Sequence, residues 1–326
     1  MESPKTIEDW LEQALQTPAP KFITGLRGSG KANFLHRIRQ ELLAQGVPPE
    51  RILFLDTEDP ALRRYATHVQ MLDYVADQLP REGLSYILIR EATELPMPEI
   101  VVGALAATSR FSVFATSSSR LLLRRGLKDY FSGQILHVKL LPAERSEPYP
   151  MLEARARWNE IFLYDVIATN TILEFPIINQ LACWLSDNLG APVSLRQVAC
   201  AISPSARLLS PHTIEAYLTA LEDAHLVEKS ARWDTAERAP QKTNYRYFFT
   251  DPWLRLAHFG PAPEDEDRRM ALNRAWLHLR RTRGRTYVAS GTPGLDFVTE
   301  SGLETLGWTV TPAGELVQAA IDPPRT

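Results

Sequence analysis

Short apolar runs alternate with longer amphipathic segments over the first 145 residues. The runs that we interpret as strands are Phe22–Thr24, Ile52–Asp56, Tyr86–Arg90, Ser112–Thr116 and Ile135–Leu140. Between them, segments such as Ala61–Leu79 repeat their apolar positions at helical spacing. This alternation predicts an α/β fold with a parallel five-stranded sheet covered by helices on both faces. Ligands of such sheets bind at the carboxyl ends of the strands.

The pattern changes after residue 145. A connecting helix is predicted at Trp158–Asn170, and three more follow at Ile177–Leu189, Ser194–Ile202 and Pro211–Leu226. Two apolar runs, Val227–Arg232 and Tyr245–Phe249, then flank a polar loop and predict a β-hairpin. Three helices followed by a hairpin is the order of an α+β winged helix.

A charged linker, Pro261–Arg269, precedes a small α/β tail. The tail is predicted to contain a helix at Ala271–Arg281 and short strands near Thr286–Ala289, Leu295–Val298, Thr309–Thr311 and Glu315–Ala319. The chain is thus predicted to form three domains, over residues 1–145, 146–260 and 261–326.

Composition limits the classes of function. The chain has 326 residues, of which 44% are apolar and 23% charged, as is ordinary for a globular protein. No apolar run approaches the roughly 18–20 residues of a membrane span, and residues 1–20 carry no secretion signal, so we expect a cytoplasmic protein. The net charge of −3 offers no global polycation for nucleic acid. The two cysteines, Cys183 and Cys200, lie in helical patterns without metal-ligand spacing.

The segment Gly25–Lys31 carries the clearest candidate chemistry. It reads Gly-Leu-Arg-Gly-Ser-Gly-Lys and lies between a predicted strand and an amphipathic stretch. Glycines allow a tight turn whose N–H groups form an anion nest, and the following helix N-terminus adds positive charge. This context favours a phosphate-binding loop over an ordinary glycine-rich turn, with Lys31 directed at the β- and γ-phosphates of a nucleotide. The predicted nucleotide contacts are Gly25, Arg27, Gly28, Ser29, Gly30, Lys31, Ala32 and Asn33.

Ala32 stands where the phosphate-loop motif requires Ser or Thr. The hydroxyl lost at this position is the one that holds magnesium. The loop therefore keeps its phosphate cradle, but magnesium binding is doubtful, and we predict no metal ligands.

The chain resembles a bacterial and archaeal family of AAA-like P-loop ATPases, in which a winged helix and a restriction-endonuclease-like domain follow the ATPase core. The resemblance covers nearly the whole chain and implies ATP or a related nucleotide as ligand. The residues that carry it are Ile23-Thr24-Gly25-Leu26-Arg27, Phe54-Leu55-Asp56, Tyr86-Ile87-Leu88-Ile89, Ala115-Thr116-Ser117, Thr213-Ile214 with Leu218 and Leu221-Glu222, and Leu295-Asp296-Phe297-Val298.

The chain departs from this family at the end of the third strand. The family has an Asp–Glu pair there, in which Asp supports magnesium and Glu activates water, whereas this chain has Arg90-Glu91. Glu91 is then a residual general base. Arg90 either replaces the charge of the metal beside the triphosphate, or pairs with Glu91 or faces solvent. Thr116, Ser117 and Ser118 end the fourth strand, where such folds carry a polar sensor of the γ-phosphate. Polar strand ends are also common simply because strands end in loops.

The tail departs from the family as well. A nuclease-like site needs a Glu, an Asp and a Glu-x-Lys pair, and the matching positions are Asn273, Asp296 and, for the lysine, Ala320. We therefore expect a degenerate domain without DNA cleavage, in which Asp296 serves hydrogen bonding.

Charge also weakens the case for DNA binding. The predicted helix Pro211–Leu226 has no Lys or Arg, and residues 174–250 hold seven basic against eight acidic residues. The basic residues of the wing are Lys229, Arg232, Arg238, Lys242 and Arg246. We expect weak or no DNA binding there, and a protein partner.

The sequence favours a degenerate AAA-like protein, a pseudo-ATPase that binds ATP, hydrolyses it poorly or not at all, and acts through a partner. Two alternatives stay open, an active magnesium-dependent ATPase associated with DNA and a nucleotide-free interaction scaffold. The sequence predicts no oligomeric state.

Overall fold

The computed structural model describes residues 7–127, 131, 134–170, 174–203, 208–301, 304–319 and 321. The chain divides into two compact units, residues 1–143 and 144–326, which we call the N-terminal and C-terminal units. The division lies beside the predicted boundary at 145, and the predicted boundary at 260 falls inside the C-terminal unit. No helix among the described residues has the length and apolar character needed to cross a membrane.

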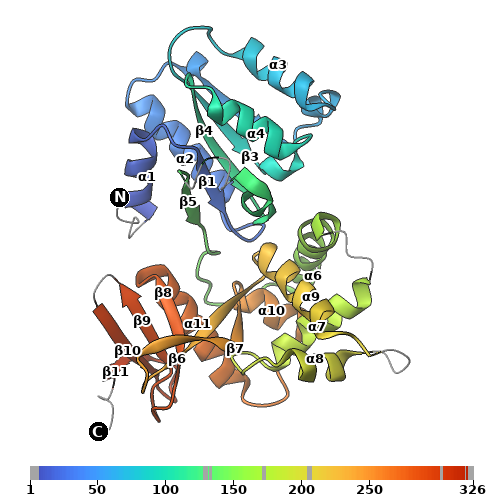
Figure 1. Ribbon diagram of the computed structural model, residues 1–326, viewed down its shortest axis with the longest axis vertical. Coiled ribbons are helices and arrows are strands. Elements are labelled where there is room, and N and C mark those ends of the chain that lie inside the picture. The colour runs from blue at the N-terminus through green and yellow to red at the C-terminus, as the bar shows by residue number, and fades with distance from the viewer. Residues whose placement is uncertain are drawn as a thin grey trace. The chain divides into compact units, whose positions relative to one another are not determined.

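A parallel five-stranded sheet organises the N-terminal unit, with the strands in the order β2-β3-β4-β1-β5 (Figure 1). The strands are β1 (Lys21–Thr24), β2 (Ile52–Asp56), β3 (Ser85–Arg90), β4 (Phe111–Ser117) and β5 (Leu136–Lys139). The predicted sheet is confirmed. Because β1 lies between β4 and the edge strand β5, the loop after β1 emerges between these two strands at the carboxyl edge of the sheet.

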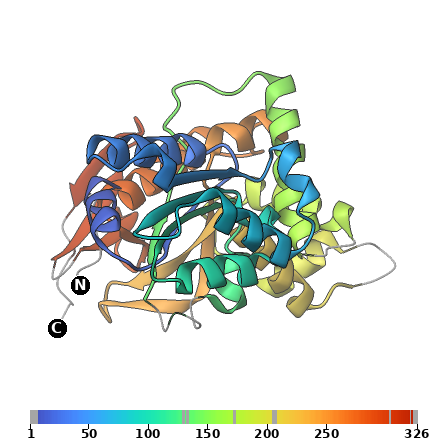
Figure 2. The same cartoon turned by 90° about the horizontal axis from the view of Figure 1, so that it is seen from above.

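Helices cover both faces of this sheet (Figure 1, Figure 2). The helices are α1 (Ile7–Gln16), α2 (Lys31–Ala44), α3 (His68–Gln78) and α4 (Pro98–Ala107). Successive strand residues point to opposite faces, so Ile23 and Leu88 pack with α1 and α2. Phe22 and Ile89 instead pack with α3 and α4. This two-sided burial explains why the strands read as continuous apolar runs.

The helix predicted over Ala61–Leu79 is wrong in its first part. A 3-10 turn over Pro60–Arg64 comes first, and α3 begins only at His68. Thr67 causes this start, because its hydroxyl accepts from the N–H of Gln70 at 3.2 Å while the side chain of Gln70 accepts from the N–H of Thr67 at 3.2 Å. This reciprocal cap fixes the helix N-terminus.

The C-terminal unit contains a six-stranded sheet in the order β11-β10-β9-β8-β6-β7. Its strands are β6 (Val227–Asp234), β7 (Ala239–Phe249), β8 (Arg285–Ser290), β9 (Phe297–Ser301), β10 (Glu304–Val310) and β11 (Leu316–Ala319). The predicted hairpin is present as antiparallel β6 and β7. Parallel pairing of Arg232–Asp234 with Val288–Ser290 then joins the hairpin to the tail strands in one sheet.

The helices of the C-terminal unit include the three predicted before the hairpin. They are α6 (Met151–Glu160), α7 (Phe175–Asp187), α8 (Leu195–Ile202), α9 (Pro211–Asp223), α10 (Pro252–Phe259) and α11 (Glu266–Thr282). The connecting helix begins at Met151 rather than Trp158 and continues as a π-helical stretch over Ile161–Ala168. Pro150 is the N-cap of this helix, so its missing N–H removes no hydrogen bond within the helix.

An aromatic cluster ties α6 to α10. Trp158 stacks on His258 with ring centroids 4.3 Å apart and on Phe162 at 5.2 Å. Phe259 meets Trp158 edge-on at 4.7 Å. In the described part of the chain, Nδ1 of His258 is buried without a hydrogen-bond partner. Such a site favours the neutral imidazole.

Acid is expected to destabilise the C-terminal unit through His258. Burial first and Arg155 second lower the pKa of His258 from 6.5 to about 4. Because the folded chain binds this proton less readily than the unfolded chain, the stabilisation is complete above about pH 6.5 and is lost as the pH falls towards 4. His258→Phe keeps a stacked ring and removes the proton. Thermal unfolding should therefore depend on pH less steeply in this variant, whereas the exposed His278→Phe should follow the unmodified protein. If thermal unfolding of the unmodified protein and of both variants depended on pH equally steeply, the assignment of this effect to His258 would be contradicted.

Candidate nucleotide site

The loop between β1 and α2 has the geometry of a phosphate cradle. Gly28 and Gly30 have φ angles of 79° and 92°, in the left-handed region that glycine adopts at least cost. The N–H of Gly25 donates to the carbonyl of Ser117 at 3.3 Å, which fastens the loop to the end of β4. A Cβ on Gly25 would lie 2.2 Å from the carbonyl oxygen of Leu140. Position 25 therefore requires glycine, because the backbone just after β5 approaches it closely.

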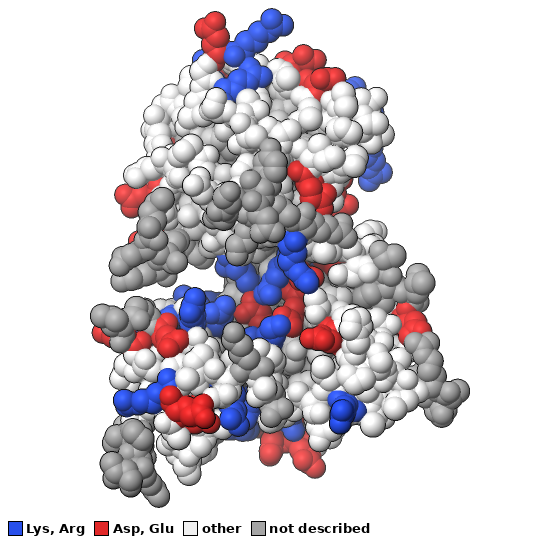
Figure 3. Space-filling model, in the orientation of Figure 1, with Lys and Arg blue, Asp and Glu red and all other residues white. Residues whose placement is uncertain are grey.

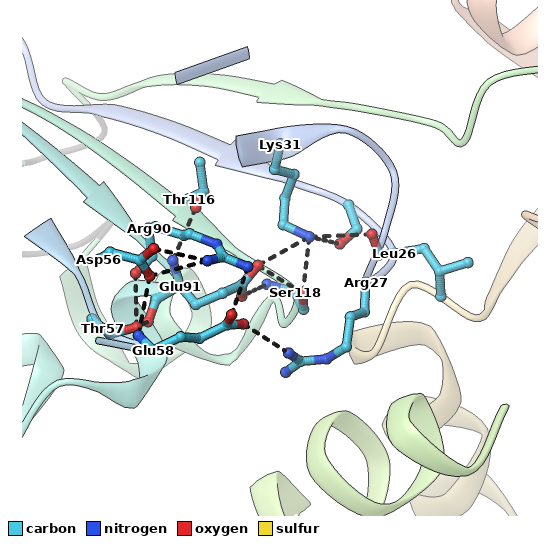
Figure 4. A network of polar contacts seen from close by, with 11 residues as sticks. Leu26, Arg27, Lys31, Asp56, Thr57, Glu58, Arg90, Glu91, Thr116 and Ser118 are labelled. Carbon is cyan, nitrogen blue, oxygen red and sulfur yellow. Dashed lines mark hydrogen bonds and ion pairs between the residues drawn. The ribbon is translucent and has the colours of Figure 1, made fainter. Parts of the chain in front are cut away.

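Lys31, the first residue of α2, is buried with its ammonium surrounded by oxygen atoms (Figure 4). Its Nζ donates to the carbonyls of Gly25 at 3.0 Å and Leu26 at 3.1 Å, and to Oγ of Ser118 at 2.9 Å. It also lies 3.2 Å from Oε1 of Glu91. The cation is thus held inside the loop by two of the loop's own carbonyls, together with Ser118 and Glu91.

Glu91 follows β3 with a left-handed backbone, φ 46°. Its carboxylate accepts from the N–H of Ser118 at 2.7 Å and from the hydroxyl of Ser118 at 3.0 Å. Its own N–H donates to Oγ1 of Thr116 at 3.0 Å. Burial by itself raises the pKa of Glu91, but Lys31, Arg27 and the bonds from Ser118 outweigh burial and lower the pKa below its usual value. Glu91 is therefore an ionised carboxylate in a fixed position.

Arg90, the last residue of β3, is engaged by two carboxylates, and the hypothesis that it replaces a metal beside the triphosphate stays a prediction. Its Nη1 donates to both carboxylate oxygens of Asp56, at 3.1 and 2.9 Å, and its Nη2 lies 2.6 Å from Glu58. Burial opposes its charge, yet Asp56 and then Glu58 raise the pKa of Arg90. The cause is sheet register, because Asp56 is the direct partner of Arg90 across β2 and β3. The guanidinium is thus held by Asp56 at the end of β2 and by Glu58 after it, while part of the side chain remains exposed.

Magnesium does not fit the positions where this fold holds it. Ala32 offers a methyl group, and Arg90 is a cation whose donors are engaged by Asp56 and Glu58. Among the described residues, no three His, Cys, Asp or Glu side chains are arranged as metal ligands. The loop thus has cradle geometry, while positions 32 and 90 carry no oxygen ligand for the ion.

The remaining predicted contacts are distributed around this centre. Arg27 approaches Glu58 at 3.7 Å, Oγ of Ser29 is buried without a partner in the described chain, and Asn33 is exposed. The hydroxyl of Ser117 donates to the carbonyl of Ser119 at 2.7 Å, so it shapes the turn after β4.

Sequence reasoning named Ser118 only as part of the polar strand end, and it overlooked Asp56 and Glu58 as site residues. Ser118 lies in the polar run that follows β4, and Asp56 ends an apolar strand at the ligand-binding edge. Both are signals that could have been used, whereas nothing local marked Glu58.

Comparison with known proteins agrees with this geometry. Residues 17–148 match the model of the family described as AAA domain. The N-terminal unit is an AAA domain. It carries the P-loop NTPase fold, a fold that generally binds nucleotides.

Similar proteins extend over both units. An uncharacterized protein of Haemophilus influenzae is 24% identical over an alignment of 292 positions, with 78% of this chain and 73% of that protein covered. A Walker-type ATPase of Pyrococcus abyssi is 12% identical, with 79% of this chain and 98% of that chain covered and a TM-score of 0.41. A chain from the structure of Drosophila ORC bound to AT-rich DNA and Cdc6 is 13% identical, with 76% and 91% covered and a TM-score of 0.27.

The basic residues of the hairpin after the AAA domain are largely paired. Lys229 lies 3.5 Å from Glu222, and Arg232 lies 3.3 Å from Asp234. Arg246 donates to the carbonyl of Gly190 at 2.9 Å, and burial followed by Arg232 lowers its pKa. Arg238 is exposed at the turn, and the side chain of Lys242 lies outside the described residues. Figure 3 shows basic and acidic side chains next to one another over the face of the C-terminal unit.

The residues of the predicted nuclease position serve structural roles. Asp296 accepts from Arg268 at 2.7 Å and from the N–H of Val310 at 2.7 Å. Asn273 is fully buried. Its Oδ1 accepts a hydrogen bond from the N–H of Phe249 at 3.0 Å, and its Nδ2 donates one to the carbonyl of Phe249 at 2.8 Å. Ala320 lies outside the described residues.

Asp296→Ala is expected to reduce the stability of the C-terminal unit by about 1–3 kcal/mol, because it removes two charge-assisted hydrogen bonds. Neither the variant nor the unmodified protein should cleave DNA with magnesium or manganese. Urea unfolding and a DNA nicking assay measure the two effects, with the exposed Glu315→Ala as control. Metal-dependent nicking that disappears in Asp296→Ala would refute the structural role.

Proposed function

We propose that this chain is a nucleotide-binding protein that holds ATP, or a related nucleotide, by its phosphates and hydrolyses it slowly or not at all. The observation that supports this proposal most directly is a contrast between two parts of one site. Gly25, Gly28, Gly30 and Lys31 have cradle geometry, while the positions that should support magnesium carry Ala32 and an arginine already bound by two carboxylates.

The chain's own groups would act as follows. Backbone N–H groups of the loop and the start of α2 would bind phosphate oxygens. Lys31 would exchange part of its contact with Glu91 and Ser118 for phosphate. Glu91, ionised and held by Ser118, would act as a residual base only after leaving Lys31 for a water molecule. Magnesium supplies much of the charge neutralisation in phosphoryl transfer, so its loss predicts a large fall in rate.

Two alternatives have an observation each in their favour. An active magnesium-dependent ATPase is favoured by the ionised Glu91 and by Asp56, a carboxylate at the same edge one strand away. A nucleotide-free scaffold is favoured by the charge balance of the site, since Lys31 and Arg90 are already paired with carboxylates.

The C-terminal unit would supply the binding of a partner. We interpret α7, α8, α9 and the β6–β7 hairpin as a winged helix. Because most of its described cations have protein partners, we propose a protein partner in the cytoplasm and weak or no DNA binding.

ATP turnover distinguishes these functions. The unmodified protein with magnesium should hydrolyse ATP more slowly than about 0.1 per second, well below ordinary enzyme rates. Turnover above that value, abolished by Glu91→Gln and unchanged in the exposed Glu94→Gln, would establish the active ATPase instead. Absence of any nucleotide binding would establish the scaffold.

A further inference from the structure

The segment Glu144–Pro150, which we call the strap, forms the first residues of the C-terminal unit and leads into α6 (Figure 1). It has no regular secondary structure, and most of its residues are exposed. Two attachments nevertheless hold it at the start of α10. A segment that is held by a few contacts opens at a lower free energy than a packed core does.

The first attachment is the buried side chain of Tyr149. Its hydroxyl donates to Oδ2 of Asp251 at 2.8 Å and accepts from Nη1 of Arg157 at 3.1 Å. Asp251 is itself fixed, because its Oδ1 caps α10 by accepting from the N–H of Leu254 at 3.0 Å. Burial first and Asp251 second raise the pKa of Tyr149 to about 12, so the hydroxyl keeps its proton at neutral pH and remains a donor.

The second attachment is a backbone carbonyl of the strap. Nε1 of Trp253, in the first turn of α10, donates to the carbonyl oxygen of Arg145 at 2.7 Å. The guanidinium of Arg145 lies over the ring of Tyr149, 3.9 Å from the ring centroid. This cation–π contact joins the two attachments, so release of Tyr149 also removes a support of Arg145.

We propose that the strap has a second, released state, and that its release lengthens the connection between the two units. While the strap is attached to α10, this connection consists of residues 141–143, which span roughly 10 Å at most. After release it consists of residues 141–150, which span up to roughly 35 Å. The longer connection would widen the reach of the C-terminal unit for a partner. This inference goes beyond nucleotide binding and does not depend on it.

Tryptic cleavage after Arg145 tests the strap in the full chain. The bond to be cut carries the carbonyl that Trp253 holds, so cleavage reports how often the strap opens. Tyr149→Phe keeps the ring and removes the hydroxyl, and it should speed this cleavage about tenfold, the value of a hydrogen bond to a charged group. Tyr287→Phe removes a bond of the same kind, to Glu300 at 2.8 Å, and should leave the rate unchanged.

Cleavage after Arg238, exposed in the turn between β6 and β7, is the internal reference. A global loss of stability would speed cleavage at both sites. The released state would be overturned if Tyr149→Phe left cleavage after Arg145 unchanged, or if it speeded cleavage after Arg145 and Arg238 equally.

Small-angle scattering tests the length of the connection. The double variant Tyr149→Phe with Trp253→Phe lacks both hydrogen bonds of the strap and should have a larger maximum dimension than the unmodified protein. An unchanged maximum dimension, in a double variant that is cut faster after Arg145, would show local fraying of the strap and overturn its role in setting the connection.

Discussion

Replacing Lys31 by alanine is expected to weaken ATP binding at least tenfold. The ammonium is a full positive charge enclosed by the loop, and its contacts with Gly25 and Leu26 hold it there. A hydrogen bond to a charged group contributes about 1.5–3 kcal/mol, which corresponds to roughly tenfold or more in affinity. Calorimetry with ATP measures the loss, and unchanged affinity would show that the loop does not bind phosphate.

The same substitution has a second consequence for folding. Without Lys31, the buried Glu91 loses its 3.2 Å ion pair, and an uncompensated buried charge is costly. Lys31→Ala with Glu91→Gln removes that charge. We expect the double variant to recover stability but not ATP affinity, which separates the binding role of Lys31 from its structural role. Recovery of both would assign the effect of Lys31→Ala to folding alone.

Gly25→Ala is expected to destabilise the N-terminal unit by about 3 kcal/mol, at the upper end of the cost of overpacking. The added Cβ would lie 2.2 Å from the carbonyl oxygen of Leu140 and 2.7 Å from Oγ of Ser29. The first of these is backbone, so either the end of β5 or the phosphate loop must move. Urea unfolding measures the change in stability.

Gly103→Ala is the matched control for this substitution. Its Cβ would lie 3.5 Å from a methyl carbon of Leu127, an ordinary contact, and Gly103 lies within α4, where alanine is favoured by about 0.5–1 kcal/mol. Gly103→Ala should therefore raise the stability of the N-terminal unit, whereas Gly25→Ala should lower it. A Gly25→Ala protein as stable as the unmodified one would contradict the close approach of β5 to the loop.

The sheet and the phosphate loop were predictable because their causes are local. Apolar runs buried on both faces mark β1 to β4, and the spacing of Gly25, Gly30 and Lys31 marks the loop. The partners of Arg90 were not predictable in this way. They depend on the register that sets Asp56 beside Arg90, across 34 positions of sequence.

Two other features depended on tertiary structure in the same way. Ser118, rather than Ser117, contacts Lys31 and Glu91, because neighbouring side chains point in different directions at the end of β4. The pairing of β6 with β8 joins segments on either side of α10 and α11. Local sequence carries no signal for such a pairing.

The dependence of ATP binding on magnesium tests the central claim most directly. Calorimetry of the unmodified protein with ATP, in magnesium and in EDTA, should give affinities within about threefold, a difference of under 1 kcal/mol. Ala32→Ser with Arg90→Asp restores the hydroxyl and the carboxylate and should make binding magnesium-dependent. Tight binding by the unmodified protein only when magnesium is present would contradict the claim that this site holds its nucleotide without the ion.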